Sequence, residues 1–112
     1  MPTSPNELLH GTLDVLILKS LSDRARHGYG IVRHVAASTG GAVAIEEGSL
    51  YPALYRLERK GQVRGDWGVT DAGRRARFYR LTPKGRTALS RQTDAWTRFA
   101  DGVSKLLLGG TE

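Results

Sequence analysis

The spacing of apolar residues changes period twice along this chain of 112 residues, and each change limits what a segment can fold into. In successive segments up to about residue 61, apolar side chains recur every three or four positions, which is the period of a helix face. Residues 63–67 and 77–81 instead follow a two-residue period, as in the strands of a hairpin. Helical spacing then returns over residues 83–108. The sequence therefore predicts a mainly α fold with a small β-hairpin (α+β).

Glycine and proline mark the ends of the segments in the first half of the chain. Residues 1–7 contain two prolines and no apolar period, so we expect a flexible N-terminal arm there. A first helix is expected over residues 8–21, and a second that ends before the glycines at 40–41. Val43 and Ile45, in the loop that follows, either pair as a short strand or fill the core.

Residues 47–63 read EGSLYPALYRLERKGQV and predict an amphipathic helix with a cationic exposed face. Its apolar stripe, Leu50, Leu54 and Leu57, must be buried against other helices. A second track places small groups near the helix start and cations toward its end: Ser49, Pro52, Ala53, Arg56 and Lys60. Small residues permit close approach to base edges, and cations hold phosphates. An ordinary solvated helix with basic residues in its last turn gives the same pattern.

Capping residues delimit this third helix and the fourth. Ser49 suits the N-cap of the third helix, Pro52 its first turn, and Gly61 its C-terminal stop. Thr82 followed by Pro83 predicts the start of the fourth helix, because Thr is a good N-cap and Pro is tolerated at the first helical position.

The fourth helix is expected over residues 83–108, with a short tail over residues 109–112. Its apolar stripe has heptad spacing and consists of Leu89, Trp96, Phe99, Val103, Leu106 and Leu107. Roughly 25 residues at about 1.5 Å each give a helix near 37 Å long, which exceeds what a domain this small covers from one side. We therefore expect part of the stripe to form a dimer interface. Packing on the first helix is the alternative, and both hold if only the C-terminal half meets a partner.

The chain is strongly basic, with 17 Lys and Arg against 11 Asp and Glu, a formal charge of +6 and a pI near 10.2. Such a balance favours anionic partners, either nucleic acid or an acidic membrane surface. Cysteine is absent, and the apolar runs are too short to span a bilayer, so we expect a cytoplasmic protein with no disulfide and no membrane segment.

Three arginines, Arg74, Arg75 and Arg77, lie within four positions at the tip of the expected hairpin. This concentration suits binding to an anionic surface. A merely solubilising role would place arginines there too.

Residues suited to catalysis or to metal binding do not occur in a usable arrangement. His27 and His34 are seven positions apart and could share a helix face. The pair has no third Cys, His or carboxylate in register to complete a metal site, and His10 stands alone. No nucleophile, base and orienting group occur at a familiar spacing. We therefore expect neither an enzyme nor a cofactor or metal site.

Three strings together resemble the PadR family of bacterial transcriptional regulators, over about nine tenths of the chain. They are HGYGIVRHV from His27, EEGSLYPALYRLERKG from Glu46 and RRARFYRLTPKGRTAL from Arg74. The resemblance implies a winged helix-turn-helix DNA-binding domain over residues 8–82 and a C-terminal dimerisation helix over residues 83–108. Ending where it does, the chain is similar to the short form with a single C-terminal helix.

The resemblance further implies a homodimeric, sequence-specific DNA-binding regulator, usually a repressor, on a pseudo-palindromic operator. The third helix is then expected in the major groove of double-stranded DNA, with the wing on the adjacent backbone. The residues expected to contact DNA are Tyr29, Ser49, Tyr51, Pro52, Arg56, Lys60, Arg74, Arg75 and Arg77. Tyr55 suits core packing or direct contact equally well.

Some relatives in this family bind flat aromatic effectors, in certain short forms beside a tryptophan of the last helix. Trp96 is suited to such a pocket, although plain interface packing explains it too. The rival to the whole interpretation is a winged-helix module for protein–protein contact, in which the basic surface meets an acidic protein.

Overall fold

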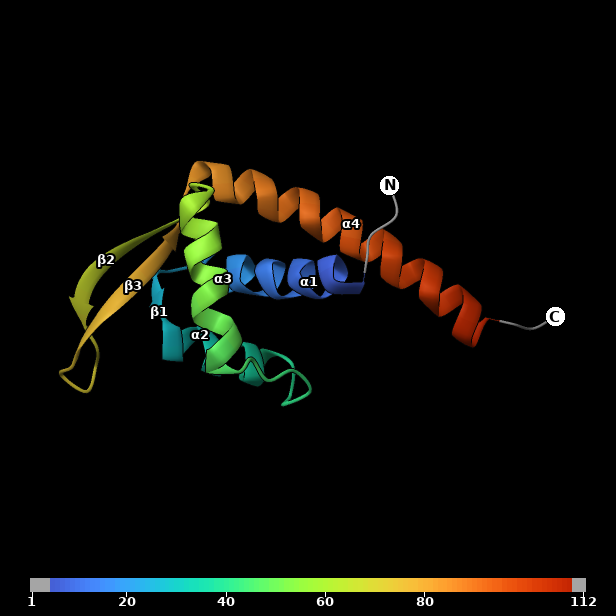
Figure 1. The fold of residues 1–112 in the computed structure, drawn as a ribbon. Coiled ribbons are helices and arrows are strands. Elements are labelled where there is room, and N and C mark those ends of the chain that lie inside the picture. The colour runs from blue at the N-terminus through green and yellow to red at the C-terminus, as the bar shows by residue number, and fades with distance from the viewer. Residues whose placement is uncertain (1–4, 110–112) are drawn as a thin grey trace.

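The computed structural model describes residues 5–109 and contains four helices and a three-stranded sheet over that range (Figure 1). In chain order the elements are α1 (Pro5–Ser20), β1 (Arg26–His27), α2 (Gly28–Ser38), α3 (Glu47–Arg59), β2 (Val63–Val69), β3 (Arg75–Leu81) and α4 (Pro83–Leu108). The predicted α+β class and winged helix-turn-helix architecture are confirmed. The first helix begins at Pro5, three residues earlier than predicted, and residues 1–4 and 110–112 of the predicted arm and tail lie outside the described residues.

The sheet is antiparallel, with strand order β1-β3-β2. Strands β2 and β3 pair along their whole length, from Val63 opposite Leu81 to Val69 opposite Arg75, and together form the wing. Strand β1 was not predicted, because two residues are too short to show any period; it adds to β3 opposite Tyr79 and Phe78. The wing is therefore anchored at its base to the start of α2.

The core lies where α1, α2 and α3 meet the base of the sheet. Its members are Ile17, Leu18, Leu21, Ile31, Val35, Ile45, Leu50, Ala53, Leu54, Leu57, Val63, Tyr79, Leu81 and Ala88. The predicted leucine stripe of α3 is confirmed. Ala53, which we predicted on the exposed track, is instead fully buried, because it lies within about 60° of the leucine stripe on the helix. Of the two readings for Ile45, core filling holds, since no strand forms there.

The N-cap of helix α3 lies three residues earlier than predicted. Glu46 is the N-cap, its carbonyl accepting from the backbone N–H groups of Ser49 and Leu50 at 3.0 Å, so Ser49 as N-cap is wrong. Pro52 consequently lies beyond the first turn, where a helix residue would normally donate its N–H to the carbonyl four positions back, at Gly48, and proline has no N–H to donate. The predicted stop at Gly61 is confirmed: its φ is +75°, and the next amide, of Gln62, returns to the carbonyl of Leu57 at 2.9 Å.

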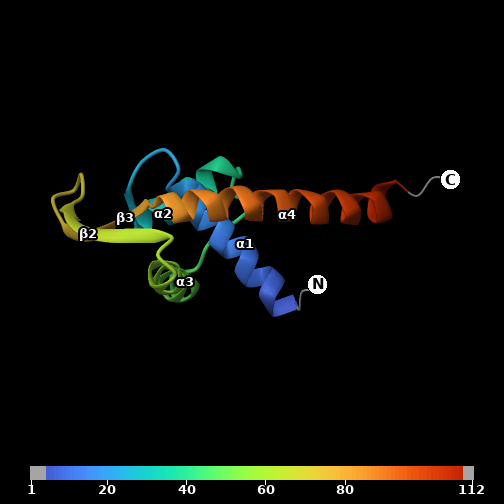
Figure 2. The same ribbon diagram turned by 90° about the horizontal axis from the view of Figure 1, so that it is seen from above.

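Helix α4 has the predicted bounds and is locked to the turn that ends α3. Thr82 Oγ1 accepts from the backbone N–H of Gly85 at 3.0 Å, and the Thr82 N–H donates to the Gln62 carbonyl at 3.1 Å. A Cβ atom at Gly85 would overlap that same carbonyl oxygen, so only glycine permits the approach. From this corner α4 crosses α1 obliquely, packing against it, and continues past it (Figures 1 and 2).

Candidate nucleic-acid interface

The outward face of α3 is set by the burial of its leucine stripe. With about 100° of rotation per residue, the positions opposite that stripe are Gly48, Pro52, Tyr55 and Arg59. All four are exposed; the Tyr55 side chain is 63% accessible, and the Arg59 guanidinium carbon lies 5.7 Å from the centroid of its ring. Arg59 was missed by the sequence analysis, and its position opposite the stripe is the signal that could have identified it.

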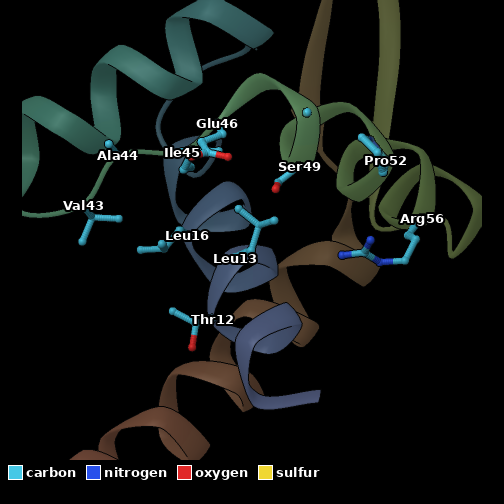
Figure 3. Close-up of a pocket in the computed structure, with 11 residues that line it drawn as sticks. Thr12, Leu13, Leu16, Val43, Ala44, Ile45, Glu46, Ser49, Pro52 and Arg56 are labelled. Carbon is cyan, nitrogen blue, oxygen red and sulfur yellow. The ribbon is translucent and has the colours of Figure 1, made fainter. Parts of the chain in front are cut away.

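One flank of α3 faces α1. Figure 3 shows the Ser49 and Arg56 side chains pointing toward α1, across a cavity of about 510 Å³ that also borders the loop at Val43. Arg56 Nη2 lies 2.8 Å from Oδ1 of Asp14, a residue only 6% exposed on α1. A buried carboxylate requires a cationic or hydrogen-bonding partner, and Arg56 supplies it. Lys60, at the C-cap of α3, lies exposed at the far end of the helix.

The other flank of α3 faces the start of α2. The Tyr51 ring is half exposed, but its hydroxyl oxygen would lie only 2.5 Å from a Cβ atom at Gly28, so glycine makes room for it. Burial raises the pKa of the Tyr51 phenol, and the nearby Glu47 carboxylate and Tyr79 add to the effect. The phenol therefore stays neutral, and its O–H group can donate a hydrogen bond to an anion.

The HGYG turn holds Tyr29 outward at the start of α2. His27 Nδ1 caps the helix by accepting from the Gly30 N–H at 3.2 Å, and its ring stacks on Phe78 at 5.2 Å between centroids. A side chain at Gly30 would collide with the His27 ring. Tyr29 is exposed, with the Arg33 guanidinium carbon 5.6 Å from its ring centroid.

The tip of the wing presents Arg74 and Arg75 to solvent. The Arg75 guanidinium carbon lies 4.9 Å from the centroid of the Trp67 ring, which is 64% exposed, in a cation–π contact. Trp67 was not among the predicted contact residues. A cleft of about 810 Å³ separates the wing from the starts of α2 and α3, lined in part by Tyr29, Arg33, Tyr51, Trp67, Arg74 and Arg75.

The third wing arginine is placed differently. Arg77 donates through Nη1 and Nη2 to the two carboxylate oxygens of Glu58 on α3, at 3.1 and 2.8 Å. Nη2 also lies 3.3 Å from the Gly65 carbonyl oxygen. The hydrogen bond to Glu58 raises the pKa of the Arg77 guanidinium, which remains charged throughout the usable pH range. The predicted contact residues thus divide into an exposed group and two arginines, Arg56 and Arg77, that already hold a carboxylate.

The apolar stripe of α4 splits between the fold and the solvent. Leu89 packs against the core, whereas the remaining predicted interface residues are exposed, from Val103 at 37% to Leu106 at 81%; these are Trp96, Phe99, Val103, Leu106 and Leu107. The Trp96 and Phe99 ring centroids are 6.1 Å apart. Trp96 lines neither of the two cavities described above, and its role beside an effector stays a prediction.

Within the part of the chain that the structure describes, no helix combines the length and the apolar character that crossing a membrane requires. Over the same residues, no cluster of three or more His, Cys, Asp or Glu is arranged to hold a metal ion.

Comparison with known proteins gives a consistent result. The chain is 33% identical over 94 residues to the transcriptional regulator Rv3488 of Mycobacterium tuberculosis, covering 84% of this chain and 80% of that protein. Among solved structures, it resembles a transcriptional regulator from Clostridium thermocellum, with a TM-score of 0.79, 27% identity, and coverage of 89% and 97% of the two chains. It also resembles a PadR family transcriptional regulator from Eggerthella lenta, with a TM-score of 0.71, 34% identity, and coverage of 92% of this chain and 88% of that chain. Residues 17–91 match the family described as "Transcriptional regulator PadR-like family", and the chain belongs to that family.

Proposed function

We propose that this protein is a cytoplasmic, homodimeric repressor, without enzymatic activity, that binds a specific pseudo-palindromic sequence in double-stranded DNA. The observation that carries the proposal is the outward track of α3, with Pro52, Tyr55 and Arg59, standing beside a wing whose tip exposes Arg74 and Arg75. A small residue, a flat ring and long cations on one convex face match the needs of a helix that enters a groove.

In the proposed complex, α3 lies in the major groove, which is about 12 Å wide and accepts a helix about 10–12 Å across. Pro52, Tyr55 and Arg59 face the base edges, with Ser49 at the margin of the same surface. Base edges supply sequence information, so these positions set the operator preference.

Residues around the cleft beside the wing are assigned to the DNA backbone. They are Tyr29, Tyr51, Arg74 and Arg75, with Lys60 at the other end of α3. Phosphate contacts of this kind fix the position of the protein on the duplex without reading sequence. Arg56 and Arg77 reach DNA only if they release their carboxylate partners, Asp14 and Glu58.

The exposed half of the α4 stripe is assigned to the dimer interface. A two-fold dimer places two copies of α3 on one side of the duplex, with half-sites about 34–36 Å apart or a multiple of this distance. Apolar side chains such as Leu106 and Leu107 are then covered by the partner's helix rather than by water.

Selection of bound duplexes from a random pool tests the proposal. We expect a recovered motif with two-fold symmetry. Binding to it should weaken steeply with salt: a dimer with about eight phosphate contacts gives a slope of about −7 in log K against log salt. If the protein shows no affinity for any duplex at low salt, the protein–protein module becomes the better interpretation of the basic surface.

A further inference from the structure

A double hydrogen-bonded ion pair joins the wing to the recognition helix. Glu58 lies near the end of α3, on the side facing the wing, and Arg77 lies near the start of β3, opposite Trp67 on β2. The two carboxylate oxygens accept from the two guanidinium nitrogens at 3.1 and 2.8 Å. Both side chains are about two thirds covered, at 31% and 38% exposure. This is more coverage than the arginines at the wing tip have.

Besides Glu58, two neighbours, Tyr79 and Gly65, fix the Arg77 side chain in this position. Its guanidinium carbon lies 5.6 Å from the Tyr79 ring centroid, and one nitrogen approaches the Gly65 carbonyl. A Cβ atom at Gly65 would lie only 2.8 Å from the Arg77 guanidinium carbon, so a larger residue there would displace the arginine. Planar, two-pronged pairing fixes orientation as well as distance, which a single lysine–carboxylate contact does not.

We propose that Glu58 and Arg77 are positioning residues that set the angle of the wing against α3, and that Arg77 supports DNA binding through this geometry rather than by contacting phosphate. The inference rests on the proposed function. The covalent link between α3 and the wing is the turn at Gly61 and Gln62, at the base of the hairpin. Pairing of β1 with β3, as far as Phe78, anchors the base of the wing to the start of α2. The ion pair at Arg77, the next residue along β3, adds a direct attachment to α3 itself, and this attachment fixes the angle between the wing and α3.

A direct contact between Arg77 and a DNA phosphate would give the opposite effect when Glu58 is removed. If Arg77 bound a phosphate, Glu58 would compete for it and would also repel the DNA, so removing the carboxylate would strengthen binding. In the positioning role, removing the carboxylate releases the wing and weakens binding. The sign of the Glu58 effect therefore separates the two roles.

The experiment measures binding of Glu58→Ala, Arg77→Met, Arg77→Lys and the Glu58→Ala/Arg77→Met double variant to the selected duplex over a series of salt concentrations. A random-sequence duplex is run alongside. We expect each single variant to lose about tenfold in affinity, the double variant to lose no more than either single variant, and the salt slope to stay unchanged. Lysine at position 77 should not restore binding, because it cannot pair with both oxygens.

Tighter binding by Glu58→Ala, a smaller salt slope in Arg77→Met, or near-normal binding by Arg77→Lys would each overturn the proposal. Arg75→Gln is the matched control, since Arg75 is an exposed cation on the same strand. It should lower the salt slope.

Hydrogen exchange of the free protein tests the ion pair without DNA. Amides of β2 and β3 should exchange faster in Glu58→Ala and Arg77→Met than in the parent protein, whereas those of α2 keep their protection. The same amides should be unaffected in Arg74→Gln, since Arg74 is an exposed cation at the tip of the wing. Unchanged exchange in the wing would overturn the positioning role, whether or not the protein binds DNA. Failure of the parent protein to bind any duplex would count against the proposed function alone.

Discussion

Asp14 shows how one residue can hold α3 in place. Its carboxylate is almost completely buried on α1, and the Arg56 guanidinium from α3 lies 2.8 Å away. Taking a carboxylate out of water is unfavourable unless a charge or several donors replace the lost hydration. The pair therefore ties α3 to the helix that also packs against α4.

The two members of this pair should not contribute equally to stability. Arg56→Met leaves the buried Asp14 charge without its partner, and we expect the free energy of unfolding to fall by about 2 kcal/mol, less than for a fully buried pair because Arg56 is partly exposed. Asp14→Asn leaves an arginine that can turn to solvent, and should cost about 1 kcal/mol. Urea denaturation measures both. Equal effects of the two substitutions would contradict this asymmetry.

Gly85 and Gly102 form a matched pair of glycines in α4. Gly85 touches the Gln62 carbonyl, whereas a Cβ atom at Gly102 would meet nothing within 4 Å. We expect Gly85→Ala to destabilise the fold by about 3 kcal/mol or more, because backbone must move. Gly102→Ala should stabilise it by up to about 1 kcal/mol, because alanine favours helix. Thermal melts of the two variants should therefore shift in opposite directions.

The arginines show why side-chain roles could be predicted only in part. Arg56 meets a carboxylate 42 positions away, and Arg77 one that is 19 positions away. Spacing along one element reveals which residues share a face, but not which distant residue packs against that face. The sequence therefore identified a cationic surface without separating its free arginines from its paired ones.

At the scale of elements, the wing and α3 should make different contributions to DNA binding. Replacing Arg74 and Arg75 together with glutamine should weaken binding to all sequences alike. Because a dimer has two wings, the salt slope should shrink by as much as about 4. Binding measured on the selected and random-sequence duplexes provides the test. Loss of discrimination between them would show that the wing reads bases.

Arg59 tests the contribution of α3. Arg59→Met keeps the stem of the side chain and removes the charge, and we expect a loss of preference at one position in each half-site, worth about 1–3 kcal/mol. Repeating the selection with the variant shows which position relaxes. Lys60→Met is a suitable control, because its residue lies next along the chain but off the outward track. Uniform weakening by Arg59→Met would reassign Arg59 to the backbone.

Element ends were predictable where local chemistry determines them. Thr82 caps α4 through its own side-chain hydroxyl, Gly61 ends α3 through its positive φ, and the structure places both boundaries as expected. Ser49 failed as a predicted N-cap because the chain before it is already helical from Glu47. Strand β1 could not be predicted, since it exists only through its pairing with β3.

The whole molecule is elongated, with principal extents of 58 × 28 × 24 Å, because α4 continues past the core. Its exposed stripe leads to a prediction about assembly. Val103→Asp should give monomers, because a charge on the stripe would be buried on dimerisation, and affinity for the paired half-sites should fall sharply.

Light scattering after size exclusion measures the assembly state of this variant. Thr97→Asp is the control, since its side chain is exposed and points away from the stripe. It should remain dimeric. A Val103→Asp protein that is still dimeric would place the interface elsewhere on the molecule.

The lock between α4 and the end of α3, made by Gly85 and Thr82 at the Gln62 carbonyl, has a mechanical consequence. Helix α4 is about 39 Å long, so a rotation of about 5° between the two α4 helices of the proposed dimer would displace the far end of each by about 3 Å. That displacement is close to the rise of one base pair, about 3.4 Å. Because Gly85 holds the start of α4 tightly against the end of α3, a small tilt where two α4 helices cross in the proposed dimer would change the distance between the two copies of α3 by about one base-pair step.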